Sequence, residues 1–255
     1  MSKELIEIAF YSLNEANLVA TAVRAASKSA LRVNVFMDSR TAPEELQILR
    51  DSRIEYRLAH NEAPSIPEGI YPDMCRQLEC EWVWILNVDE WASPELVEAV
   101  QEAVQKAPAD VQCFGFARRW VRLKSPGQVQ YSRLFRMRRG DYQWRVIRHR
   151  SVLFEARTPH TPGFRFDAQR AAKLPKSSLL YHFDWIAHSF DVRKRKLDLY
   201  EKLHKGPRNY FADYYLPEQR EWLHFFKNVN VTEVTALARE MEGISSVRGW
   251  ADEFQ

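Results

Sequence analysis

The chain has 255 residues, of which 45% are hydrophobic and 28% charged, and its net charge at pH 7 is +3. This composition is typical of a globular protein with one large domain or two small ones, and it excludes a fibrous or disordered chain. The net charge is too small to indicate a polyanionic partner by itself. No apolar run approaches the length of a transmembrane helix.

The first part of the chain, to residue 92, alternates between expected strands and helices. We expect strands at 5–12, 32–39, 53–59 and 82–88, and helices at 14–29, 41–52 and 72–81. Thr41 and Glu44 match a capping box at the start of the second helix. Alternation with short connections predicts an α/β fold, with a mostly parallel sheet covered by helices on both faces.

Polar side chains follow three of these strands. They are, in chain order, Asn14, Glu15, Asp38, Ser39, Asn87, Asp89 and Glu90. Ligands of parallel sheets bind beyond the carboxyl ends of the strands, so we expect these side chains to line a cleft. The alternative is that they are helix caps and turn residues, as Asn14 and Ser93 could be. Asp89 and Glu90 fit that alternative less well, because Ser93 already caps the helix that follows them.

The second part of the chain has a different pattern. Expected strands at 111–123, 127–139, 141–154 and 177–183 interleave aromatic residues with arginine and predict an antiparallel region. Helices are expected at 188–205, 217–229 and 231–244. In the middle one, the helical spacing of Trp222, Phe225, Phe226 and Val229 indicates core or interface packing.

Residues 118–150 are strongly basic, and Asp141 is the one acidic residue among them. The basic residues are Arg118, Arg119, Arg122, Lys124, Arg133, Arg136, Arg138, Arg139, Arg145, Arg148 and Arg150. Such a field favours an anionic ligand or acceptor, and a solvated sheet face explains it equally well.

Cysteines and histidines limit the possible metal sites. Cys75, Cys80 and Cys113 lack the paired spacing of a zinc site, and an odd number without a secretory signal fits a reducing compartment. We therefore expect a soluble cytoplasmic protein, at most in peripheral contact with a membrane. Asn87 and Asp89 instead offer the oxygen ligands that Mg²⁺ or Mn²⁺ prefers. A cation there would neutralise a departing nucleoside diphosphate.

Five stretches together resemble the family 2 glycosyltransferases of the GT-A fold. They are YSLNEANLVATAV, VNVFMDSRT, WVWILNVDEWASPEL, SRLFRMRRGDYQWRVIRH and LLYHFDWIAHSFDVRKRKLDLYEK, within about residues 5–203. The short bacterial subgroup with lipopolysaccharide-core sugar transferases is the most similar. The resemblance implies a GT-A domain at 1–185, with a nucleotide-binding half (1–92) and an acceptor half (93–185), and a packed helical extension at 186–255.

The resemblance also implies a UDP- or GDP-linked sugar donor, a divalent cation (Mn²⁺ or Mg²⁺) and an inverting transfer to an acceptor hydroxyl. It implies Asp89 as the metal ligand, with His182 completing the site, and places Asn87 near the ribose. Further nucleotide-sugar contacts are implied for Tyr11, Asn14 and Glu15, for Asp38 at the base, for Arg133 and Arg136 at the diphosphate or acceptor, and for His149. The acceptor stays open: the basic, aromatic second half of the chain suits an anionic one, such as a phosphorylated glycolipid core or, second, nucleic acid.

The chain departs from the family pattern at two positions. Asn87 replaces the first Asp of the Asp-x-Asp motif, and Arg150 replaces the Glu that follows His149. An inverting transfer needs a general base near the acceptor hydroxyl. The candidates that remain open are Asp141, Glu155, Asp184 and Glu90, and the expected catalytic set is Asp89, Glu90 and Asp141.

Two other functions stay open. A catalytically weakened nucleotide-sugar-binding protein on the same scaffold would explain Asn87 and Arg150. A nucleotidyltransferase is less consistent with the sequence, because no Gly- and Arg-rich phosphate loop follows the first strand. No role is assigned to the histidines outside the family positions, since a lone histidine is more often packed than a ligand. These are His60, His160, His188, His204 and His224.

Overall fold

The computed structural model describes residues 4–125, 127–134, 141–156, 161–204, 209–219, 221 and 224–244. The strands are β1 (Ile6–Ser12), β2 (Arg32–Asp38), β3 (Arg57–Ala59), β4 (Trp82–Asn87), β5 (Glu90–Ala92), β6 (Cys113–Ser125), β7 (Gln128–Leu134), β8 (Asp141–Arg148), β9 (Leu153–Phe154), β10 (Phe164–Arg165), β11 (Ala171–Lys173), β12 (Leu179–His182) and β13 (His224–Asn228). The α-helices are α1 (Ala16–Ala26), α2 (Pro43–Asp51), α3 (Tyr71–Arg76), α4 (Pro94–Gln105), α5 (Asp184–Ala187), α6 (Phe190–Leu203), α7 (Asn209–Tyr215) and α8 (Thr232–Ile244). Short 3₁₀ turns are η1 (Pro67–Ile70), η2 (Ala168–Arg170) and η3 (Pro217–Gln219).

The four strands β1 to β4 form the parallel half of the sheet. Their spatial order is β3-β2-β1-β4, and all three pairings between them are parallel. The chain order reverses between β1 and β4, so a crevice opens beyond the carboxyl ends of these two strands. Tyr11 of β1 lies opposite Asn87 of β4 in the register, at the mouth of that crevice.

The antiparallel half continues the same sheet. β8 pairs antiparallel with β4, and the order then runs through β6 and β7 to β13. β12 adds to this half, parallel to β6 and antiparallel to β5. The predicted α/β fold, with a parallel part followed by an antiparallel one, is confirmed.

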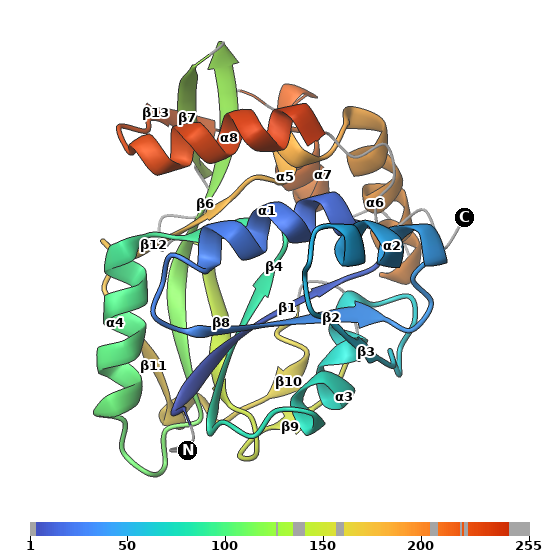
Figure 1. Cartoon of the computed structure of the whole chain (residues 1–255). Helices are drawn as coiled ribbons and strands as arrows, with labels where there is room; N and C mark the ends of the chain where they lie inside the picture. Colours follow the sequence, from blue (N-terminus) through green and yellow to red (C-terminus); the bar gives the residue numbers. More distant parts are fainter. Residues whose placement is uncertain are drawn as a thin grey trace.

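Side chains of the parallel strands alternate between two apolar clusters, one on each face of the sheet. Trp82 and Trp84 join the cluster under α1, α4 and α8, whereas Val83 and Ile85 join the cluster with α3. In Figure 1, α1, α2 and α8 lie on one side of the sheet and α3 lies on the other. Burial of both faces explains why β4 is continuously apolar from Trp82 to Leu86 instead of alternating.

Two local predictions were wrong. The segment 217–229 was expected to be a helix, but 224–228 is the strand β13, antiparallel to β7. The capping box of Thr41 and Glu44 does not form, because Ala42 occupies the N-cap of α2 without a side-chain hydrogen bond. The predicted cap of α4 is confirmed, since the Ser93 side chain accepts a hydrogen bond from the Leu96 amide at 3.2 Å.

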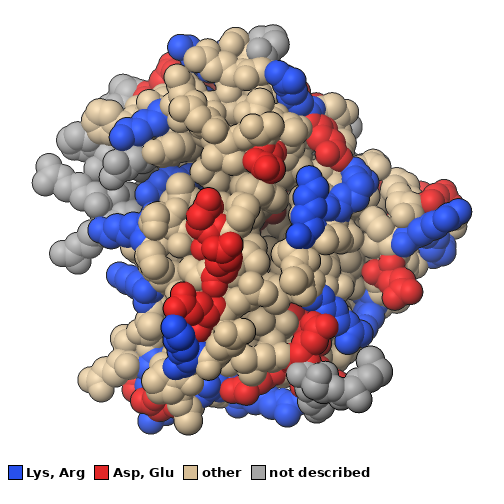
Figure 2. Space-filling view, turned by 60° about the vertical axis from the view of Figure 1, so that its left-hand side comes forward, with Lys and Arg blue, Asp and Glu red and all other residues tan. Residues whose placement is uncertain are grey.

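Basic and acidic side chains are mixed over the face of the molecule drawn in Figure 2. The basic residues of the strands β6 and β8 divide between surface and interior: Lys124 is exposed, whereas Arg118 is buried. Within the parts of the chain that the structure describes, no helix has the length and apolarity that crossing a bilayer requires.

Candidate functional site

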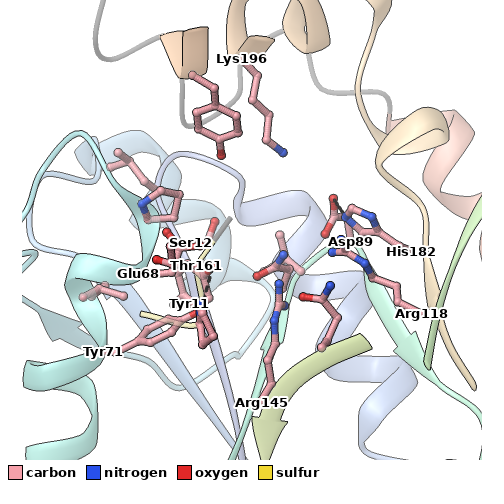
Figure 3. A pocket seen from close by; sticks show the side chains of 18 of the residues that line it. Tyr11, Ser12, Glu68, Tyr71, Asp89, Arg118, Arg145, Thr161, His182 and Lys196 are labelled. Carbon is pink, nitrogen blue, oxygen red and sulfur yellow. Dashed lines mark hydrogen bonds and ion pairs between the residues drawn. The ribbon is translucent and has the colours of Figure 1, made fainter. Parts of the chain in front are cut away.

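A cavity of about 640 Å³ opens beyond the carboxyl ends of β1 and β4. Its lining comes from β1, β4, β6, β8, β12, the turn η1 and the helix α6. Figure 3 shows Asp89, His182 and Arg118 at one side, Tyr11, Tyr71 and Glu68 at the other, and Lys196 directed into the cavity from α6. This volume lies in the range that small-molecule ligands occupy, about 300–1,000 Å³.

Asp89, His182 and Asp184 form a buried cluster at one end of the cavity. Asp89 lies in the turn between β4 and β5, His182 ends β12, and Asp184 begins α5. The antiparallel pairing sets His182 opposite Glu90, and the Phe183 amide donates to the Asp89 carbonyl at 2.7 Å. One potential ligand atom from each of the three residues lies within 4.8 Å of the others.

Several polar atoms of this cluster lack a hydrogen-bond partner among the described residues. They are Asp184 Oδ2 and His182 Nδ1, together with Asn87 Oδ1 beside the cluster. His182 Nε2 is 3.1 Å from Asp89 Oδ2. An unsatisfied buried polar group costs about 1–3 kcal/mol. Carboxylate oxygens and imidazole nitrogens that face one another in this way fit a divalent cation, because one cation can coordinate all of them.

His188 and Lys196 neutralise the carboxylates behind the cluster. His188 Nε2 lies 2.9 Å from Glu15 Oε1, and His188 Nδ1 lies 3.0 Å from Asp184 Oδ1. Burial lowers the pKa of His188, but the contacts with Asp184 and Glu15 outweigh it and raise that pKa to about 10. Lys196 Nζ approaches the same Asp184 oxygen at 3.1 Å. Both side chains are therefore cationic at neutral pH.

The carboxylates of the cluster stay ionised. Burial alone would raise the pKa of Asp89, but His182 outweighs burial and holds this pKa well below its usual range. Burial would likewise raise the pKa of Asp184, and Lys196 and His188 lower it instead. The cluster thus presents two carboxylates to a ligand, as a cation site requires.

Glu90 lies between two arginines instead of facing the cavity. Its carboxylate accepts from Arg145 at 2.7 Å, from Arg118 at 3.3 Å and from the Asn87 amide at 2.9 Å. The side chain is fully buried. This arrangement suits a residue that holds Arg118 and Arg145 in place better than one that accepts a proton from substrate.

Asp141 does line the cavity, and it is also ion-paired. Its Oδ2 accepts from Arg118 Nε at 2.8 Å and from the Trp120 indole at 3.3 Å. Burial would raise the pKa of Asp141, but Arg118 outweighs burial and lowers it. A carboxylate with a lowered pKa is a weak proton acceptor.

The opposite end of the cavity is aromatic. The rings of Tyr11 and Tyr71 meet edge to face with centroids 5.3 Å apart, and their hydroxyl oxygens are 3.4 Å apart. Burial raises the pKa of both hydroxyls, so they stay protonated. Aromatic side chains with a polar tip suit a ligand that has a ring and hydroxyl groups.

The other predicted contacts have local roles in the fold. Asn14 has a φ of 58°, which Asn tolerates, and its Oδ1 accepts from the Ala42 amide at 2.8 Å. It thus joins the β1–α1 connection to the start of α2. Asp38 lines the cavity, but Arg40 binds both of its oxygens at 2.8 and 2.6 Å.

Three further predicted residues lie elsewhere or outside the described residues. His149 Nε2 is buried against the Cys80 carbonyl oxygen at 2.8 Å, away from the cavity lining. Arg133 lies on β7, opposite Phe225 of β13. Arg136 falls outside the described residues.

Sequence analysis named Arg118 and Arg145 only within the basic stretch, left His188 without a role and did not consider Lys196. The strand alternation could have identified Arg118, because it shares a face with the buried Phe116 and Trp120. His188 lies four residues after Asp184, one helical turn along α5, and this spacing could have paired the two. Lys196 carries no comparable signal, since only the packing of α6 over the cavity brings it to Asp184.

No family model and no curated protein matches the chain. Among solved structures it is similar to TarS 1–349 of S. aureus, with 12% identity and a TM-score of 0.38, over 48% of this chain and 38% of that one. It is also similar to the glucosyl-3-phosphoglycerate synthase of Mycobacterium tuberculosis with Mn²⁺ and UDP-glucose, with 12% identity and a TM-score of 0.34, over 45% of this chain and 43% of that one. The matched part spans less than half of either structure, so the function proposed below depends on the site itself.

Proposed function

We propose that this chain is a glycosyltransferase of the GT-A type, which moves a sugar from a nucleotide-sugar donor to an acceptor hydroxyl with the help of a divalent cation. One observation carries the proposal: a buried Asp89–His182–Asp184 cluster with unsatisfied donor atoms lies where the strand order reverses, at the end of a cavity of ligand size. Membership of family 2 and the inverting outcome belong to the same proposal.

Asp89, His182 and Asp184 would hold the cation, Mn²⁺ or Mg²⁺. Asp184 would supply the negative charge that Asn87 lacks. Its Oδ2 is available to the cation, because it makes no hydrogen bond among the described residues. When bound, the cation would neutralise the diphosphate of the leaving group. Lys196, with its amine directed into the cavity, adds a second positive charge there.

The nucleotide would extend from this cluster toward β1 and β2. Asn87, which lies opposite Tyr11, would meet the ribose, and its unsatisfied Oδ1 supports this role. Tyr11, Glu15 and Asp38 all line the cavity. Asp38 is less available for a base than the resemblance implies, because Arg40 occupies both of its oxygens.

The acceptor and the location stay proposals with less support. The basic composition of residues 118–150 supports an anionic acceptor: a phosphorylated glycolipid first and nucleic acid second. Contacts with such an acceptor are proposed for Arg133 and Arg136. The domain at 1–185, with its halves at 1–92 and 93–185, the extension at 186–255 and a cytoplasmic location are proposed on the sequence alone.

Calorimetry tests the function directly. Wild-type protein should bind UDP or GDP, and Mn²⁺ should tighten that binding. Asp89→Ala should remove the effect of Mn²⁺ while circular dichroism shows an intact fold. Affinity that Asp89→Ala leaves unchanged would contradict the proposal. Tight nucleotide binding without hydrolysis of any UDP- or GDP-sugar would favour the binding-protein alternative that Asn87 and Arg150 motivate.

A further inference from the structure

Glu68 is a carboxyl group of the cavity that sequence analysis did not consider. It lies in η1, between β3 and α3, and is half-buried. Its Oε2 is buried and has no hydrogen-bond partner among the described residues. Figure 3 shows Glu68 in the lining with Tyr11, Ser12 and Thr161.

The other carboxylates that line the cavity are each engaged by a cationic or imidazole side chain. The pairs are Glu15 with His188, Asp38 with Arg40, Asp89 with His182, and Asp141 with Arg118. Of the remaining general-base candidates, Glu90 binds two arginines and Asp184 binds Lys196. Glu155 pairs with Arg165. Proton acceptance from a substrate requires a carboxylate that these partners do not occupy.

A glycine makes room for Glu68 and Tyr71. Gly163 has a φ of 76°, and a Cβ on it would lie 2.7 Å from the Glu68 Cβ and 2.9 Å from the Tyr71 ring. The Gly163 carbonyl is held by the Glu155 amide at 2.8 Å, which fixes this close approach. The packing of η1 against the segment at Gly163 therefore fixes the position of Glu68.

We propose that Glu68 is the catalytic base of the transfer. This inference rests on the proposed function and adds the residue that it lacks. The acceptor oxygen forms a bond to the anomeric carbon of the donor sugar while the bond from that carbon to the diphosphate oxygen breaks. The electron pair leaves with the nucleoside diphosphate, and the hydroxyl proton passes to Glu68 Oε2.

The surroundings of Glu68 suit this role. Burial raises the pKa of Glu68 to about 7, against a smaller lowering by the backbone amide of Glu68 itself and then by Arg145 and Lys196. The other titratable side chains that interact electrostatically with the Glu68 carboxylate are Tyr11, Tyr71, Tyr200 and Tyr215. A base whose pKa lies near the working pH is ionised in much of the protein and still binds the proton strongly enough to accept it from the substrate.

The experiment compares Glu68→Gln with wild type in hydrolysis of UDP-glucose and GDP-mannose, where water replaces the acceptor, from pH 5.5 to 9 with Mn²⁺. We expect the wild-type rate to rise with pH through about 7, as Glu68 ionises. Glu68→Gln should lose about 100-fold or more in kcat and also lose this pH dependence. Its Kd for UDP should stay within about threefold of wild type.

Two further variants complete the design. Glu62→Gln is the matched control, because Glu62 lies in the same loop, half exposed and paired with Arg76 at 3.2 Å, and it should keep the wild-type rate. Glu68→Ala should regain activity on addition of formate, which replaces the missing carboxylate.

The outcomes separate this inference from the proposed function. A wild type that hydrolyses donor together with a Glu68→Gln variant that keeps its rate and pH profile overturns the role of Glu68 alone. Weaker UDP binding by Glu68→Gln with an unchanged kcat also overturns it, since Glu68 would then bind the nucleotide. A wild type that neither binds nucleotide nor turns over any donor overturns both.

Discussion

Replacing Glu90 by Gln should destabilise the fold strongly. The substitution keeps the shape of the side chain but leaves the guanidinium groups of Arg118 and Arg145 without their shared charge. Removing one partner of a buried ion pair costs about 3–5 kcal/mol. Arg118 keeps Asp141 at 2.8 Å, and the Gln oxygen can still accept one hydrogen bond, so we expect the lower end, about 3 kcal/mol.

Urea unfolding followed by tryptophan fluorescence measures this loss as a lower midpoint at an unchanged slope. Glu102→Gln is the control, because its pair with Lys106 is exposed to solvent and the midpoint should stay close to that of wild type. A loss below about 1 kcal/mol for Glu90→Gln would refute the reasoning. If turnover vanished at wild-type stability, Glu90 would be the base, which is one of the four candidates that the sequence left open.

Three other predictions concern the metal site, pH and a helix cap. Asp184→Asn should weaken Mn²⁺ binding about tenfold or more in calorimetry, and unchanged affinity would exclude a third ligand. Because burial raises the pKa of Glu68 from 4.5 to about 7, its contribution to stability is full below pH 4.5 and is lost as the pH rises through 7. The wild type should therefore lose about 3 kcal/mol of unfolding free energy relative to Glu68→Gln when urea unfolding is measured at pH 8.5 instead of pH 4.5. If the unfolding free energies of the two proteins change in parallel with pH, the raised pKa of Glu68 is contradicted. Ser93→Ala should cost about 1 kcal/mol of unfolding free energy, and no loss would show that the cap contributes nothing.

The parallel half of the fold could be predicted because its strands are buried on both faces. Such a strand needs an unbroken apolar run, and β4 has one that ends in polar residues at the rim of the sheet. The rule that ligands bind at this rim then identified Asp89, and the family resemblance added His182. The structure brings these two residues together from the turn after β4 and the end of β12.

The strand β13 could not be predicted, because short apolar segments fit a helix and a strand equally well. Phe225 and Phe226 of this strand and Val229 just after it have helical spacing, but the hydrogen bonds to β7 decide the structure. Likewise, the basic composition of 118–150 indicated an anionic ligand without showing which arginines point inward. The register between β6 and β8, which sets Arg118 opposite Asp141, decides that.

A crystal structure with UDP and Mn²⁺ tests the central claim most directly. We predict an anomalous manganese peak between the Asp89 carboxylate and the His182 imidazole, with Asp184 as a further ligand and the diphosphate on the same ion. A manganese ion bound away from Asp89, or a nucleotide bound outside this cavity, would contradict the account.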